Sequence, residues 1–167
     1  MDGPLKNLLV VDLTRVLVGP YCTMMLSDMG ARVIKVEAPG IGDDSRKFGP
    51  FVKDNSAYFM SLNRGKESIA LNLKDEEDKK IFLNILSKAD ILVENFKPGT
   101  LEKWGFGWKD MCKKFPKLIY ASASGFGQTG PLKELPAYDM VVQGMGGLMS
   151  VTGQPNSEPT RVGTSIG

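Results

Sequence analysis

Short apolar runs alternate with amphipathic stretches along the first three quarters of the chain. An apolar run closed by a polar residue, such as Leu8 to Asp12, is typical of a strand buried on both faces of a sheet. Because helical stretches separate the runs, the strands are expected to be parallel. The pattern therefore predicts an α/β fold, an open, mostly parallel sheet with flanking helices, whose strands cover residues 8–12, 33–37, 69–73, 91–95 and 118–122.

The stretches between the predicted strands carry helix start and stop signals. Gly19-Pro20 suits a helix start, since proline's missing N–H and fixed φ fit the first turn, and Gly30 suits the end of that helix. Asp75 is expected to cap a helix with an acidic first turn and one apolar stripe, formed by Ile81, Phe82, Ile85, Leu86 and Ala89. The remaining signals predict a short helix capped by Thr100, a helical piece over 108–115 and a loop over 40–55.

Composition narrows the class of protein. The chain has 167 residues, about one domain's worth, and its 42% hydrophobic and 24% charged residues exclude a disordered tail. A net charge of +2 is too small to favour nucleic acid as a partner. We expect no membrane partner and no secretory signal, because neither a long apolar run nor a basic N-terminal segment is present. Cys22 and Cys112 lie far apart, which argues against a disulfide framework and fits a cytoplasmic location.

The sequence contains no histidine. Catalysis by Ser-His-Asp or Cys-His arrangements, and zinc held by histidine, are therefore excluded for this chain, and no metal is expected. Any chemistry must come from carboxylates, lysine, tyrosine, serine, cysteine or backbone amides.

Loops that follow the predicted strands are the candidate binding segments. Ligands of parallel sheets bind beyond the carboxyl ends of the strands, where helix N-termini also gather. Taken singly, each loop has an ordinary structural explanation, since glycine, proline and asparagine are turn residues. Together they predict a pocket rich in amides, with Lys74, Lys97 and Lys103 nearby to meet anionic phosphates; the loops cover residues 14–19, 37–42, 72–74, 94–99 and 122–130.

One of these loops matches the spacing of a dinucleotide-binding motif but lacks its context. Gly125-Phe126-Gly127-Gln128-Thr129-Gly130 has the G-x-G-x-x-G pattern after a predicted strand. Pro131 follows at once, so no long helix opens there, and no acidic residue stands about 20 positions further on. We therefore interpret it as a flexible glycine loop, either a plain linker or a loop that closes over a reacting centre.

The order and spacing of the segments resemble the N-terminal part of the class III CoA-transferases, the family of the formyl-CoA and carnitine CoA-transferases, which has acyl-CoA racemases as relatives. The resemblance spans essentially the whole chain and implies a Rossmann-like fold. It is carried by Val11-Asp12-Leu13-Thr14 with Gly19-Pro20, Gly30-Ala31-Arg32-Val33-Ile34-Lys35-Val36-Glu37 with Gly40 and Gly42-Asp43, residues 63–74, Ala89 to Phe96 with Pro98-Gly99, Ser124-Gly125-Phe126-Gly127 through Gly130-Pro131, Ala137-Tyr138-Asp139, and residues 143–153.

The resemblance implies roles for individual residues. Coenzyme A, as acyl-CoA, would be a substrate and not a covalently bound cofactor. The amides of Gly125 and Gly127 would stabilise oxyanions. Where many relatives carry a nucleotide-binding arginine this chain has Ala38, and either Lys35 or Arg46 is a candidate replacement. The implied CoA-binding residues are Val16, Leu17, Val18, Leu71, Lys74, Asn95, Phe96, Lys103 and Tyr138.

The resemblance also places the family's nucleophile, an aspartate, directly after Gly167, the last residue here. The chain therefore looks like an N-terminal fragment, residues 1–167 being the CoA-binding N-terminal part of the large domain. By itself it is expected to be inactive, and the full-length protein is expected to form an interlocked homodimer.

Three functions are compatible with these residues. The first is transfer of CoA from an acyl-CoA to a carboxylic acid through an aspartyl intermediate, which needs neither metal nor histidine. The second is racemisation of an acyl-CoA, which the missing histidine disfavours, since racemase relatives place one where Tyr138 stands. The third is a non-catalytic nucleotide-binding fragment.

Overall fold

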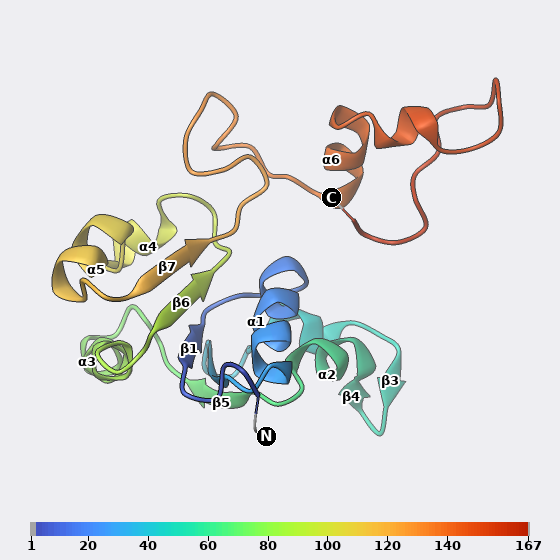
Figure 1. The fold of residues 1–167 in the computed structure, drawn as a ribbon. Helices are drawn as coiled ribbons and strands as arrows, with labels where there is room; N and C mark the ends of the chain where they lie inside the picture. Colours follow the sequence, from blue (N-terminus) through green and yellow to red (C-terminus); the bar gives the residue numbers. More distant parts are fainter. Residues whose placement is uncertain (1–2, 167) are drawn as a thin grey trace. The chain divides into compact units, whose positions relative to one another are not determined.

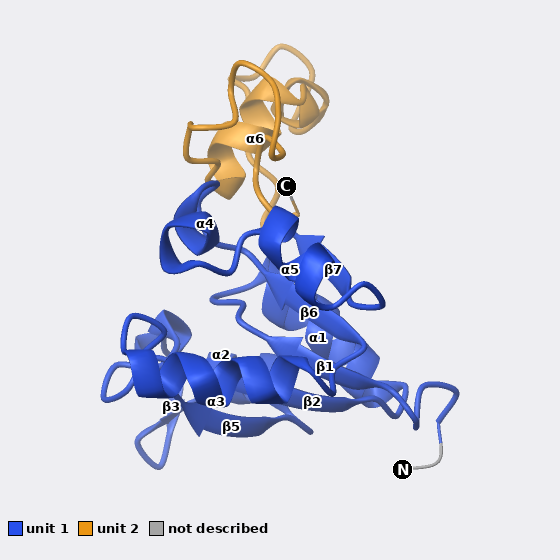
Figure 2. Ribbon diagram, turned by 90° about the vertical axis from the view of Figure 1, so that its left-hand side faces the viewer, with its two compact units in different colours: residues 1–123 blue, residues 124–167 orange. Residues whose placement is uncertain are grey.

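The computed structural model describes residues 3–166. The chain forms two compact units, Met1–Ala123 and Ser124–Gly167 (Figure 2).

The first unit is built on a five-stranded sheet in the order β5-β2-β1-β6-β7 (Figure 1). Every neighbouring pair is parallel, which confirms the predicted fold class. The chain leaves β1 toward β2 and β5, then returns to build β6 and β7 on the other side of β1, so a topological switch point lies between β1 and β6. The strands are β1 Leu9–Asp12, β2 Arg32–Glu37, β5 Glu67–Ala70, β6 Ile91–Glu94 and β7 Ile119–Ser122.

Helices cover both faces of this sheet, because successive strand residues point to opposite sides. Val10, Val33 and Val93 form one apolar cluster, against which Leu26 of α1 packs. The neighbouring strand residues belong to a second cluster, which also contains Phe82 of α3. The helices of the first unit are α1 Val18–Asp28, α2 Ala57–Asn63, α3 Glu76–Leu86, α4 Thr100–Trp104 and α5 Trp108–Lys114.

Several helix boundaries follow the predicted signals. Gly30, just beyond α1, has a φ of 99°, a conformation that favours glycine. The Asp75 side chain accepts hydrogen bonds from the N–H groups of Glu77 and Asp78, which confirms it as the cap of α3. The prediction for Thr100 was wrong: Thr100 is the first helical residue of α4, and Gly99, with a φ of 83°, occupies the capping position.

Three other predictions need correction. Ile81 does not belong to the buried stripe of α3, because 45% of it is exposed while Phe82 and Leu86 are buried. The stretch 40–55 is more than a loop: it contains the 3₁₀ helix η1, Asp44–Lys47, and a hairpin of β3, Phe51–Val52, and β4, Asn55–Ser56. The predicted strand over 69–73 lies earlier, at Glu67–Ala70, because β5 pairs with β2 in that register.

The second unit contains the helix α6, Asp139–Met145, and the 3₁₀ helix η2, Leu148–Val151. The glycine loop at 125–130 forms turns and bends, and no helix begins there, as its following proline predicted. Within residues 3–166, no helix is long and apolar enough to cross a membrane. The same residues contain no group of three or more acidic, histidine or cysteine side chains suited to hold a metal ion.

Candidate functional site

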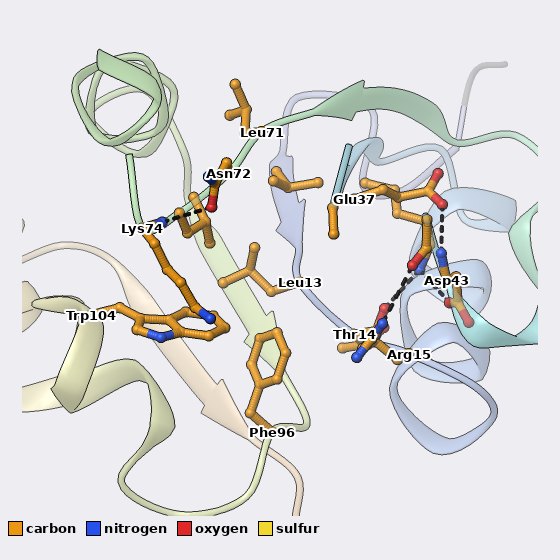
Figure 3. Close-up of a pocket in the computed structure, with 15 residues that line it drawn as sticks. Leu13, Thr14, Arg15, Glu37, Asp43, Leu71, Asn72, Lys74, Phe96 and Trp104 are labelled. Atoms are coloured by element: carbon orange, nitrogen blue, oxygen red, sulfur yellow. Dashed lines mark hydrogen bonds and ion pairs between the residues drawn. The ribbon is translucent and has the colours of Figure 1, made fainter. Parts of the chain in front are cut away.

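A cavity of about 310 Å³ lies at the carboxyl ends of the parallel strands of the first unit. Segments that follow β1, β2, β5 and β6 line it together with α4, so the topology gathers residues from five separate parts of the chain (Figure 3). This is the edge at which open α/β sheets bind ligands. The lining residues are Leu13, Thr14, Arg15, Lys35, Val36, Glu37, Ala38, Gly42, Asp43, Leu71, Asn72, Leu73, Lys74, Phe96 and Trp104.

One side of the cavity combines apolar surface with a positive charge. The rings of Phe96 and Trp104 meet edge to face, with centroids 5.3 Å apart. The ammonium group of Lys74 lies 6.0 Å from the centre of the Trp104 ring, and Figure 3 shows the lysine stem extending over the indole. Leu71 completes this wall. Such a wall can hold an apolar or aromatic ligand group beside an anionic one.

The other side is a network of buried charges around Glu37 and Asp43. Arg46 donates two hydrogen bonds of 2.7 Å to the Glu37 carboxylate, and the Ser68 hydroxyl donates a third at 2.7 Å. The ammonium group of Lys35 lies 2.9 Å from Asp43 Oδ2 and donates to the Thr14 carbonyl at 2.7 Å. These groups are paired with one another, as buried charges must be.

Burial and hydrogen bonding act in opposite directions on the Glu37 carboxyl. Burial by itself raises its pKa, but hydrogen bonds from Arg46, Ser68 and the Asp43 N–H together outweigh it and lower the pKa to about 2. Burial likewise opposes ionisation of Asp43, and the charge of Lys35 with the Ser45 hydrogen bonds lowers the pKa of Asp43 below its usual range. Both carboxyls are therefore anions near neutral pH and serve the structure as acceptors.

A second buried ionic group lies at the end of β1. Asp12 accepts hydrogen bonds from the Thr14 N–H at 2.8 Å and from the Thr23 hydroxyl at 2.6 Å. Lys66 approaches Asp12 Oδ2 at 3.0 Å, and burial lowers the pKa of Lys66 against the opposing effect of Asp12. Sequence reasoning missed Lys66, which precedes β5 and is far from Asp12 along the chain.

The network shows what Lys35 and Arg46 contact, the two residues that the resemblance offered in place of an arginine at position 38. Lys35 is buried against Asp43, and Arg46 is held by Glu37 and lies 3.8 Å from the centre of the Phe59 ring. Neither predicted replacement points a free charge into the cavity. Arg15 lies in the predicted binding loop 14–19 but was not singled out in the sequence analysis. It lines the cavity, and its guanidinium makes long contacts, 3.4 Å to the Gly42 carbonyl and 3.5 Å to Asp44.

The structure places only some of the predicted CoA-binding residues on the cavity. Leu71, Lys74 and Phe96 line it. Asn95 does not; its side-chain amide makes two hydrogen bonds of 2.8 Å to the backbone of Arg15. The other predicted residues of the first unit, Val16, Leu17, Val18 and Lys103, lie outside the lining.

The remaining predicted residues belong to the second unit. Tyr138 occupies the position before α6, makes no capping hydrogen bond with its side chain, and is exposed. A Cβ on Gly125 would lie 1.8 Å from the Ala137 Cβ, so this position requires glycine for close packing inside the unit. Gly127 has a φ of 79° and open space around it. The role of these glycines in binding oxyanions stays a prediction, and Gly167, before the expected aspartate, lies outside the described residues.

Comparison with known proteins identifies the family. The chain is 59% identical over 161 residues to the acetyl-CoA:oxalate CoA-transferase of Acetobacter aceti, covering 96% of this chain and 41% of that protein. It is 47% identical to the succinyl-CoA:glutarate CoA-transferase of Mus musculus, covering 98% of this chain and 38% of that protein. The crystal structure of a CAIB/BAIF family protein from Brucella suis superposes with a TM-score of 0.93 at 44% identity, covering 99% of this chain and 45% of that one. Since the family model for CoA-transferase family III also matches residues 5–167, the chain belongs to CoA-transferase family III.

Proposed function

We propose that residues 1–167 form the CoA-binding part of an enzyme that moves CoA from an acyl-CoA to a carboxylic acid. The observation that carries the proposal is the cavity at the carboxyl ends of the strands, where Lys74 stands beside Phe96 and Trp104. CoA offers an adenine ring, phosphates and an apolar arm, and this wall has an aromatic surface, a cation and Leu71 for them. The chain spans 41% of one matched CoA-transferase and 38% of another, so the activity of the whole protein is part of the proposal.

The proposed chemistry uses an aspartate that follows the described residues. Its carboxylate attacks the thioester carbonyl, which forms a mixed anhydride and expels the CoA thiolate. The thiolate then attacks the aspartyl carbonyl, forms an aspartyl-CoA thioester and releases the donor acid. The acceptor carboxylate repeats both steps in reverse order, which yields the new acyl-CoA and restores the aspartate. The whole protein is proposed to act as a cytoplasmic homodimer.

Within this scheme, the first unit would bind and orient CoA. Lys74 and Arg15 are the two basic side chains that line the cavity without a buried carboxylate partner, so they are the proposed phosphate contacts. Phe96 and Trp104 would pack against an apolar or aromatic part of the ligand. Charge attraction of this kind weakens as salt rises.

Titration of the purified chain with CoA, followed by calorimetry, tests the binding role. We expect binding that Lys74→Ala weakens by about tenfold, more strongly at low salt than at high salt. Lys88→Ala, an exposed lysine next to the end of α3, is the matched control and should leave CoA affinity unchanged. Absence of CoA binding, or equal affinity in the Lys74 variant, would contradict the proposal.

The transfer step is tested on the protein that extends beyond residue 167. Exchange of CoA between an acyl-CoA and a free carboxylic acid is expected in that protein and not in residues 1–167 alone. Racemisation of the acyl-CoA without exchange would favour the racemase alternative. Turnover by residues 1–167, at roughly 1 s⁻¹ or more, would require a nucleophile inside them and would refute the proposed division of labour.

A further inference from the structure

The backbone directly after β1 is held by side chains from two distant strand ends. Asn95, which follows β6, accepts the Arg15 N–H and donates to the Arg15 carbonyl, both at 2.8 Å. Lys35, on β2, donates to the Thr14 carbonyl at 2.7 Å. The backbone groups of Thr14 and Arg15 are therefore held by hydrogen bonds from side chains.

A third side chain holds the next peptide. Asp43, which caps η1, accepts the Val16 N–H at 3.1 Å through Oδ1. Val16 has a φ of 68°, a left-handed conformation that is a true outlier for a β-branched residue. Such a conformation persists only where its surroundings over-determine it. The three clamps supply that constraint.

Two of the side chains that hold this backbone, Lys35 and Asp43, also line the cavity, but they are only 2% and 1% exposed. Their charged groups are paired with each other and so are already engaged. Both the oxygen and the nitrogen of the Asn95 side-chain amide form hydrogen bonds to the Arg15 backbone, and Asn95 does not line the cavity. Thr14 and Arg15, whose backbone is clamped, do line it.

We propose that Asn95, Lys35 and Asp43 are positioning residues for CoA recognition, which act by holding residues 14–16 in place before the ligand arrives. The inference rests on the proposed function and assigns to Asn95 an indirect role in place of the contact that the resemblance implied. Preorganised loops bind more tightly because less conformational freedom is lost on association. Removing one of these side chains is therefore expected to weaken CoA binding by loosening residues 14–16.

The test combines CoA titration with amide hydrogen exchange in the purified chain. In Asn95→Ala, the reporter is the Val16 N–H, whose own acceptor, Asp43, is unchanged. We expect its exchange to quicken by about tenfold and the Kd for CoA to rise by about tenfold. Asn84→Ala, an exposed asparagine on α3, is the matched control and should change neither quantity.

A second pair of variants tests the buried clamps without leaving a lone buried charge. Lys35→Met with Asp43→Asn keeps an acceptor for the Val16 N–H, whereas Lys35→Met with Asp43→Ala removes it. We expect the Kd for CoA to be about fivefold higher in the alanine pair than in the asparagine pair. Equal Kd values for these pairs would overturn the role of Asp43.

The two readouts separate the possible failures. A weaker CoA complex with unchanged Val16 exchange in Asn95→Ala would mean that Asn95 contacts CoA directly, and would overturn the inference. Faster exchange with unchanged affinity would overturn it as well, since the clamp would then be irrelevant to binding. If the unaltered chain binds no CoA, the proposed function fails, while the exchange rates still decide whether these side chains hold the loop.

Discussion

The two units of the chain are held together in different ways. The first unit buries apolar side chains on both faces of its sheet and adds a network of paired charges at one end. Among the described residues of the second unit, the one buried side chain is that of Gln143. Several of its apolar residues are exposed instead, among them Met140, Val141, Met145 and Val151.

Hydrogen bonds take the place of a core in the second unit. Gln143 donates to Asp139 at 2.7 Å and accepts the Val162 N–H at 2.9 Å, and Asp139 also accepts the Ile166 N–H at 2.8 Å. A unit organised around one polar side chain gains little from the hydrophobic effect, which is the main stabilising contribution in folding. We therefore expect the first unit to be the more stable of the two.

The largest effect is expected from Phe82→Ala in the first unit. Phe82 is fully buried on α3 and meets Phe106 edge to face at 4.8 Å, so its removal should cost about 3–5 kcal/mol of unfolding free energy. Urea unfolding followed by the fluorescence of Trp104 and Trp108 measures it, since both tryptophans lie in this unit. The adjacent Ile81→Ala, at an exposed position, should cost less than about 1 kcal/mol. Equal losses of unfolding free energy in the two variants would contradict the burial of Phe82 and the exposure of Ile81 on α3.

The next effect is a pH dependence confined to the charged end of the first unit. The pKa of Glu37 is lowered from 4.5 to about 2, so its contribution to stability is complete above pH 4.5 and is lost as the pH falls toward 2. The contribution is roughly 3 kcal/mol. The difference in unfolding free energy between the unaltered chain and Glu37→Gln should therefore narrow as the pH falls from about 5 to about 2. A difference that is constant with pH would contradict the low pKa.

A smaller, local effect is expected from Gln143→Ala in the second unit. The change removes the acceptor of the Val162 N–H and should cost about 1–3 kcal/mol within that unit alone. Hydrogen exchange of residues 160–166 should quicken, while the tryptophan-detected unfolding of the first unit stays unchanged. Gln154→Ala, at an exposed position of the same unit, is the control. A coincident loss in both units would show that they unfold together.

The smallest effect is expected from Val151→Ser. Val151 is 81% exposed, so the change should alter stability by less than about 0.5 kcal/mol. Urea unfolding and hydrogen exchange of residues 148–152 together measure it. A loss above about 1 kcal/mol would mean that Val151 is covered, and the contrast between the two units would then be weaker than the structure indicates.

Hydrophobic periodicity and helix-cap signals were sufficient to predict most of the secondary structure of the first unit. The parallel strands, the end of α1 at Gly30 and the Asp75 cap depend on residues close together in the sequence, so local patterns predicted them. The 3₁₀ helix and the hairpin in residues 40–55 were not predicted, because glycine and proline are frequent both in plain loops and in hairpin turns. Leu71, Lys74 and Phe96 were correctly expected near the ends of the strands, where the topology brings loops together.

The amino-acid sequence by itself determined the fold class, the family resemblance and the edge of the sheet at which the cavity lies, since each follows from short apolar runs and their order. Only the tertiary structure decided that the Asn95 side chain hydrogen-bonds to the Arg15 backbone and that Arg15 lines the cavity. It also decided that Lys35 and Arg46 are paired with carboxylates. For Asn95 the physical reason is distance along the chain. A side chain's partner 80 residues away leaves no trace in local periodicity, and a buried charge is neutralised by whichever group the fold brings to it.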